Sequence, residues 1–139
     1  EDSRTAVSEL VRVLKPGGDL VVTVPRFWPE RICWAISSSY HHEPGGHIRI
    51  YRKGELLRLM DEAGARCWRI RYRHGLHAPY WWLKCFVGHK NDAFPLVKAY
   101  RKLLEWDIIR HPPLTAMIDR ILNPLIGKSM IFYLIKGYR

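Results

Sequence analysis

The chain has 139 residues, with 23 Lys and Arg against 13 Asp and Glu, which gives a formal net charge of +10. Its apolar content of 47% and charged content of 26% are typical of a globular protein and exclude a disordered one. The longest apolar runs fall well short of the roughly 20 residues of a membrane span. The three cysteines lack CxxC spacing, so we expect neither a disulfide framework nor a metal site, and we expect a cytoplasmic protein.

The first predicted elements are an amphipathic helix and a strand. Apolar residues recur at helical spacing from residue 7 to residue 14, and the sequence KPGG at 15–18 ends the helix. Residues 19–25 follow as a strand with apolar side chains on both faces, which predicts that both faces are covered. The helix is expected to bury Val7, Leu10, Val11 and Leu14.

Residues 26–50 are predicted to be irregular, with a short helix over 31–38 and a Pro- and Gly-rich loop over 40–47. A second amphipathic helix is expected over 56–63, ending at Gly64. Residues 65–73 then alternate between Arg and larger apolar side chains. This pattern predicts an edge strand with one solvated face.

The last third of the sequence predicts helices followed by a strand. Residues 79–87 favour a helix, and Asn91 and Asp92 can cap the next one, which the HPP sequence at 111–113 ends. A short helix over 114–122 is closed by Asn123-Pro124, and residues 129–135 form a strand that is apolar on both faces and therefore central. The side chains expected to face inward are Phe94, Val97, Tyr100, Leu104 and Ile108 in the first of these two helices, and Met117, Ile118, Ile121 and Leu122 in the second.

This order of elements predicts an α/β fold with only three strands. The strand at 19–25 is so apolar that a bare edge would invite aggregation, so we expect the sheet to continue beyond this chain. The sequence begins with Glu1 and opens directly on a helix. We therefore expect it to be part of a longer protein.

Two segments carry a resemblance to a known family. One is LKPGG at 14–18 with the Val-rich strand that follows it, and the other is GHIRIY at 46–51 followed by ELLRLMDEAG at 55–64. With GKS at 127–129 and the last strand, this order resembles the C-terminal half of the class I S-adenosylmethionine-dependent methyltransferases.

The resemblance implies a partial Rossmann-like sheet with a helical insert. This chain would contribute strands five, six and seven, with the last strand antiparallel and inserted between the other two. It also implies transfer of a methyl group from S-adenosylmethionine to a small-molecule or lipid-like acceptor. The expected parts are a helix and strand (1–25), an acceptor loop (26–50), a helix and edge strand (51–73), a helical insert or lid (74–126) and the last strand (127–139).

The family binds its cofactor with a Gly-rich turn after the first strand and an acidic residue that ends the second strand. This sequence has neither, because Gly17-Gly18 follows a helix. The resemblance therefore assigns the cofactor to an N-terminal half that this chain lacks, and we expect this chain by itself to be inactive.

The candidate site residues come from the acceptor loop and the lid. Ligands in open α/β sheets lie beyond the carboxyl ends of the strands, so the loop after residue 24 is expected to face the pocket. His42 and His47 are candidate general bases, because imidazole titrates near neutral pH. The candidates for binding the acceptor are Arg26, Trp28, Tyr80 and Trp81.

Each candidate also has a purely structural alternative. The histidines can belong to a solvated loop, and the tryptophans can pack the insert against the sheet. As a second function, eight Lys and Arg between residues 49 and 73 make a non-catalytic module that binds RNA or an anionic membrane surface an alternative. A family member that has lost its activity is a third possibility.

Overall fold

The computed structural model describes residues 2–44, 46–47 and 49–138. Gly45 and Ile48, which belong to the predicted acceptor loop, lie outside the described residues. The elements in chain order are α1 (Ser3–Arg12), β1 (Asp19–Pro25), α2 (Phe27–Ile36), α3 (Ser38–His41), α4 (Lys53–Glu62), β2 (Ala65–Arg73), α5 (His77–Val87), α6 (Pro95–Arg110), α7 (Pro113–Ile126) and β3 (Ser129–Lys136).

The three strands form one sheet in the order β1-β3-β2. β3 is antiparallel to both neighbours, so β1 and β2 run parallel to each other on either side of it. The prediction of an α/β fold with a central last strand is confirmed. β2 is an edge strand within the described residues, as predicted, and a bulge between Cys67 and Arg69 shifts its register.

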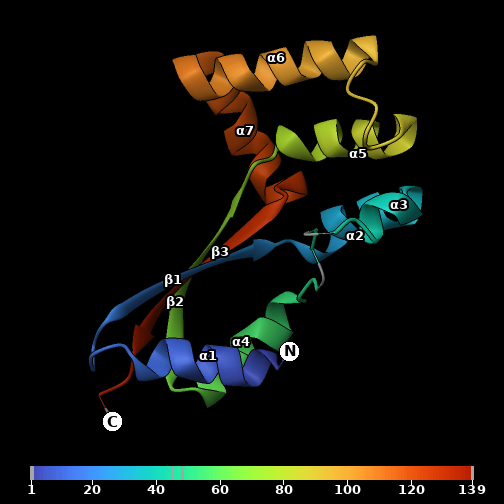
Figure 1. Ribbon diagram of the computed structural model, residues 1–139. Coiled ribbons are helices and arrows are strands. Elements are labelled where there is room, and N and C mark those ends of the chain that lie inside the picture. Colours follow the sequence, from blue (N-terminus) through green and yellow to red (C-terminus); the bar gives the residue numbers. More distant parts are fainter. Residues whose placement is uncertain (1, 45, 48, 139) are drawn as a thin grey trace.

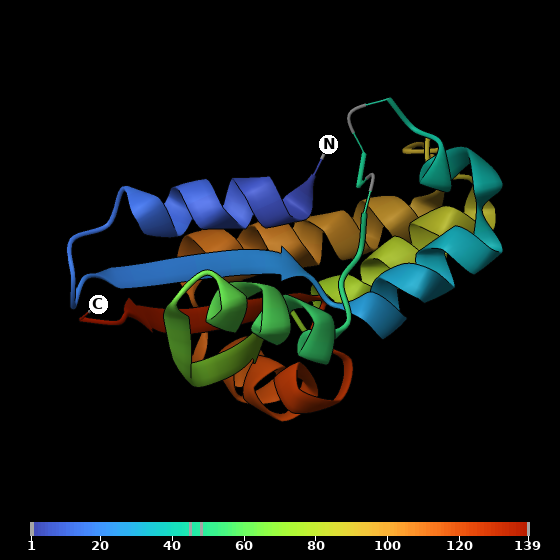
Figure 2. The same ribbon diagram turned by 90° about the horizontal axis from the view of Figure 1, so that it is seen from below.

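One face of the sheet carries the main core. Met130, Phe132 and Leu134 alternate along β3 and are completely or almost completely buried against α1 and α4. Figure 2 shows both helices over this part of the sheet. Period-two alternation in the strand and period-3.6 stripes in the helices bring these apolar sets together.

The other face of the sheet is less covered than the sequence predicts. Val21 is 56% exposed, and within the described residues β1 pairs only with β3. Leu10 on α1 is also exposed, although we expected it to be buried. Both side chains are therefore only partly covered by the described residues, and a further strand beside β1 stays a prediction.

A second core joins the three helices of the insert. Leu76, Tyr80, Val97 and Leu104 are buried there. Figure 1 shows α5, α6 and α7 grouped at the end of the molecule opposite α1 and α4. Asn123 of α7 is buried, and its side-chain oxygen accepts a hydrogen bond of 2.9 Å from the backbone N–H of Gly75.

The sequence predictions for the acceptor loop and α7 were partly wrong. The short helix expected over 31–38 is present as α2, but α2 begins earlier, at Phe27, where the sequence was predicted to be irregular. Pro29 is tolerated in its first turn because the missing N–H has no helical partner there. α7 continues to Ile126 although Pro124 lies inside it. The helical hydrogen bonds resume after the proline, where the N–H of Gly127 donates to the carbonyl of Asn123 at 3.0 Å.

The inward side of the insert helices was also partly mispredicted. Ile108, Met117 and Ile121 are each more than half exposed, whereas Ile118 and Leu122 pack against the second core. Apolar residues occur on more than one side of α7, so periodicity alone did not identify the buried side.

Replacement of Phe132 by Ala is expected to destabilise the protein by about 3–5 kcal/mol, because it leaves a cavity in the centre of the sheet. Phe132 has no exposed surface. The measurement is the free energy of unfolding from a denaturant titration. Val21→Ala is the matched control on the exposed face of β1, and it is expected to change stability by less than about 0.5 kcal/mol.

Candidate functional site

A completely buried carboxylate lies at the centre of the candidate site. Glu30 of α2 has no exposed surface, and its Oε2 is 3.0 Å from the ammonium of Lys128, the residue before β3. Its Oε1 accepts a hydrogen bond of 3.0 Å from the hydroxyl of Tyr40 and one of 2.8 Å from Nδ1 of His47. The Lys128 ammonium also donates to the Tyr40 hydroxyl at 3.3 Å.

These contacts determine the charge of the carboxylate. Burial alone would raise the pKa of Glu30, but the hydrogen bond from His47 and the charge of Lys128 outweigh burial and lower this pKa to about 2. Burial and the neighbouring Glu30 charge raise the pKa of Tyr40. Glu30 is therefore ionised at neutral pH, and Tyr40 is a neutral hydrogen-bond donor to it.

Two cavities lie beside this network and share three lining residues. The first, of about 360 Å³, is lined by Thr23, Val24, Pro25, His47, His74, His77, Trp81, Lys128 and Ser129. The second, of about 400 Å³, lies on the side of Glu43, Pro44 and His89. His47, Trp81 and Lys128 line both cavities, so they form the wall between them.

The position of the first cavity follows from the sheet. Pro25 ends β1, Arg73 ends β2 and both pair with Ser129 at the start of β3. The carboxyl ends of β1 and β2 therefore meet at this edge, which is where open α/β sheets place their ligands. Burial, followed by the nearby His74, lowers the pKa of His77 in this cavity, which leaves the ring uncharged at neutral pH.

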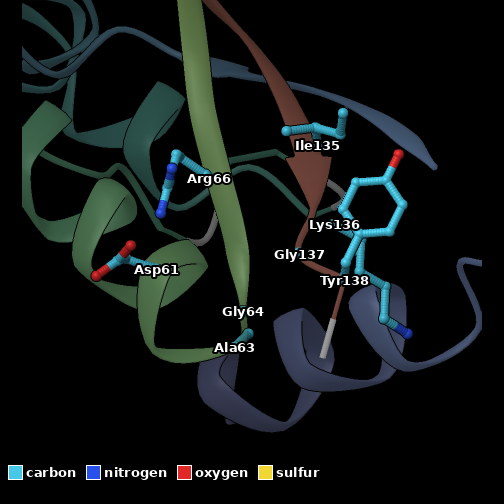
Figure 3. A pocket seen from close by; sticks show the side chains of 8 residues that line it. All are labelled: Asp61, Ala63, Gly64, Arg66, Ile135, Lys136, Gly137 and Tyr138. Carbon is cyan, nitrogen blue, oxygen red and sulfur yellow. The ribbon is translucent and has the colours of Figure 1, made fainter. Parts of the chain in front are cut away.

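A larger cavity, of about 660 Å³, lies at the opposite end of the sheet. Figure 3 shows Asp61 and Arg66 on one side of β2, and Tyr138 on the other side with β3. The Lys136 ammonium donates to the carbonyls of Arg12 and Leu14, at 3.1 Å and 2.8 Å, so it holds the end of α1. The polar side chains of this cavity do not converge on a common point, and we do not assign it the chemistry.

Two of the six residues predicted from the sequence, His47 and Trp81, line the candidate site. The Trp81 ring centroid is 4.6 Å from the Lys128 ammonium. His42 is exposed at the end of α3, where its Nδ1 is 2.8 Å from the Ser38 carbonyl. It does not line either cavity.

The other three predicted residues make structural contacts. Arg26 donates to the Pro124 and Leu125 carbonyls at 3.0 Å and 3.2 Å, and so holds the end of α7. The Trp28 ring centroid is 5.9 Å from that of Trp82, and Tyr80 is buried in the second core. A role of these three in acceptor binding stays a prediction.

Sequence reasoning gave no role to Glu30, Tyr40 and Lys128, although Glu30 lies in the loop that was expected to face the pocket. A signal was present for Glu30, because it is the only acidic residue in the largely apolar α2. Lys128 was included only as part of the motif before the last strand. Nothing in the sequence spacing indicates that residues 30, 40, 47 and 128 meet.

Two features of the described residues decide whether they can hold S-adenosylmethionine. Gly75 follows β2, but a Cβ there would be 2.7 Å from Cβ of Leu122, so α7 already fills the space that a ligand would need. The strands end in Pro25, Arg73 and Lys136, none of which offers a carboxylate to ribose hydroxyls. The described residues therefore do not fit this cofactor.

Two further properties concern the described residues only. They contain no group of three or more His, Cys, Asp or Glu side chains arranged to hold a metal ion. None of their helices has the length and apolar character that crossing a bilayer requires.

Comparisons with known proteins return no relatives for this chain. No protein-family model matches it, and searches of curated proteins and of solved structures also find no match.

Replacement of Lys128 by Met is expected to destabilise the protein by about 3–5 kcal/mol, because it leaves the buried Glu30 charge without its ion-pair partner. The double variant Glu30→Gln/Lys128→Met removes both charges and is expected to regain most of the loss. Unfolding free energies of the two variants test this. Equal stability of the single and double variants would contradict a cost from the unpaired Glu30 charge.

Acid is expected to destabilise the protein through the same carboxylate. The folded-state pKa of Glu30 is about 2, below the ordinary value of 4.5. Its contribution to stability is therefore complete above pH 4.5 and is lost as the pH falls towards 2, with a total of about 3 kcal/mol. Unfolding free energies measured across this range are expected to fall less steeply for Glu30→Gln, and parallel curves would contradict this assignment.

Proposed function

We propose that this chain supplies the acceptor side of an S-adenosylmethionine-dependent methyltransferase that acts on a small-molecule or lipid-like acceptor. The observation that supports this best is an imidazole that is held by a buried carboxylate beside two cavities, of which the first lies at the carboxyl ends of β1 and β2. The order β1-β3-β2 with an antiparallel β3 is compatible with the sheet that the sequence resemblance implies.

The role of His47 follows from its hydrogen bond. Because Glu30 is ionised, its Oε1 can only accept, so Nδ1 of His47 must carry the proton at 2.8 Å. In the neutral ring, Nε2 then has the free lone pair. A base of this kind can take the proton of an acceptor O–H or N–H, and the carboxylate then stabilises the resulting imidazolium.

The other two residues of the wall, Trp81 and Lys128, are proposed to bind the acceptor and to exclude water from it. Trp81 offers an apolar ring surface, and the Lys128 ammonium is held beside this ring by Glu30. Cavities of about 360 Å³ and 400 Å³ are in the range of small-molecule sites. The methyl donor chemistry mainly requires alignment and desolvation of the acceptor, which such walls supply.

The donor belongs outside the described residues in this proposal, because these residues do not fit S-adenosylmethionine. The resemblance assigns it to the N-terminal half of the fold. We further propose a cytoplasmic location, which the free cysteines favour.

A second candidate function is a non-catalytic module that binds RNA. Arg66, Arg69 and Arg73 are exposed along β2, next to Trp68, which is 59% exposed. Arginines with an exposed aromatic ring are typical of surfaces that bind single-stranded RNA. Steep salt dependence of RNA binding, lost in Arg66→Gln/Arg69→Gln, would favour this function over the enzyme.

Methyl transfer is tested with the protein expressed from its complete coding sequence. His47→Ala is expected to lower kcat about 100-fold or more on the best acceptor of a panel of phenols, carboxylates, amines and lipids, because it removes the base. The affinity for S-adenosylmethionine, measured by calorimetry, is expected to stay unchanged.

His42→Ala is the matched control, because this histidine lies in the same segment and does not line the cavities. It is expected to leave kcat within about two-fold, well inside the effect of losing a base. Absence of S-adenosylmethionine binding would rule out the enzyme. Equal kcat values for the two variants would rule out His47 as the base.

A further inference from the structure

The two longest helices expose a large apolar surface. On α6, Leu96, Leu103 and Trp106 follow one another at i, i+7 and i+10, where the two leucines lie beside the side that Val97 and Leu104 bury and Trp106 lies nearly opposite it. On α7, four more apolar residues recur at i, i+3, i+7 and i+11 on one side. We define the lid apolar face as Leu96, Leu103, Trp106, Ile109, Leu114, Met117, Ile121 and Leu125, each of them exposed.

This surface is not needed for the core of the insert. The second core is filled from the other sides of the helices, by Val97, Tyr100 and Leu104 of α6 and by Ile118 and Leu122 of α7. In Figure 1, α6 lies at the far end of the molecule from α1 and α4. Exposed apolar side chains in this number on two consecutive helices indicate an interaction site.

The charges next to the lid apolar face indicate what it contacts. Lys98, Lys102 and Arg110 are exposed on α6, and none of them has an ion pair with an acidic side chain within the described residues. A helix with Trp and Leu on one side and free Lys and Arg beside them is typical of helices that lie in a lipid interface. The basic side chains then reach phosphate headgroups while their methylenes stay over the apolar layer.

We infer that the lid apolar face docks onto an anionic membrane surface, with α6 and α7 lying in the interface and not crossing it. The sign of the charge agrees, because the chain carries a formal net charge of +10. The docking does not depend on methyl transfer. A further step, in which docking brings a lipid acceptor to the cavity beside Trp81, rests on the proposed function.

The test is flotation of the protein with vesicles of phosphatidylcholine alone or mixed with phosphatidylserine. We expect binding to the mixed vesicles that weakens as salt is raised. Trp106→Glu is expected to lower the partition coefficient between vesicles and water at least about ten-fold. The reason is that a charge replaces the apolar ring that would be buried in the membrane interface. The matched control is Trp68→Glu on the sheet, also an exposed tryptophan, which is expected to bind as the wild type does.

Circular dichroism shows whether the variants are folded. A second variant, Lys98→Gln/Lys102→Gln, removes two positive charges and leaves the apolar residues intact. This variant is expected to lose binding to the mixed vesicles. Equal binding by Trp106→Glu and the wild type would overturn the inference. The inference would also be overturned if the protein binds no vesicles and Trp106→Glu instead abolishes its self-association or its binding of RNA.

The two proposals fail in different ways. If the protein methylates a soluble acceptor but does not bind vesicles, the docking proposal is wrong and the methyltransferase proposal stands. Vesicle binding by a protein that binds no S-adenosylmethionine removes the enzyme and keeps the docking.

Discussion

An ionised carboxylate without any exposed surface is costly, and the arrangement around Glu30 offsets that cost. One oxygen faces the Lys128 ammonium at 3.0 Å, and the other accepts from Tyr40 and His47. Burying a charge without such partners costs several kcal/mol, so each partner must be in place whenever α2 packs. The ion pair between Glu30 of α2 and Lys128 before β3 is the constraint on which the site depends. It joins two residues that are 98 positions apart in the sequence.

This constraint explains why the site is at one end of the sheet. Lys128 directly precedes β3, whose first residues pair with the last residues of β1 and β2. Fixing the Lys128 ammonium therefore fixes the point where three strand ends meet. His47 comes from a segment between helices, yet its hydrogen bond to Glu30 gives the ring one orientation and one tautomer. Exposed ion pairs elsewhere, such as that of Arg4 with Glu62, impose no comparable order, because both partners remain solvated.

Local patterns predicted most of the elements, but only part of the site. The strands at 19–25, 65–73 and 129–135 were predicted closely, because alternation and flanking Gly or Pro are local signals. His47 and Trp81 were identified from their type and their place after predicted elements. Glu30 and Lys128 were missed because their partners are distant in the sequence, and a buried ion pair leaves no periodic trace.

The errors on the insert helices have a different origin, and they bear on what the insert does. Helical periodicity reports that an apolar side exists, and a helix with two apolar sides gives no preference between them. α7 has such sides: Ile118 and Leu122 face the second core, whereas Met117 and Ile121 face outward. A helix that needed only to pack would have no reason to keep the outer side apolar. Two of the three mispredicted residues, Met117 and Ile121, belong to the lid apolar face, which is the expected result if this surface contacts something other than its own chain.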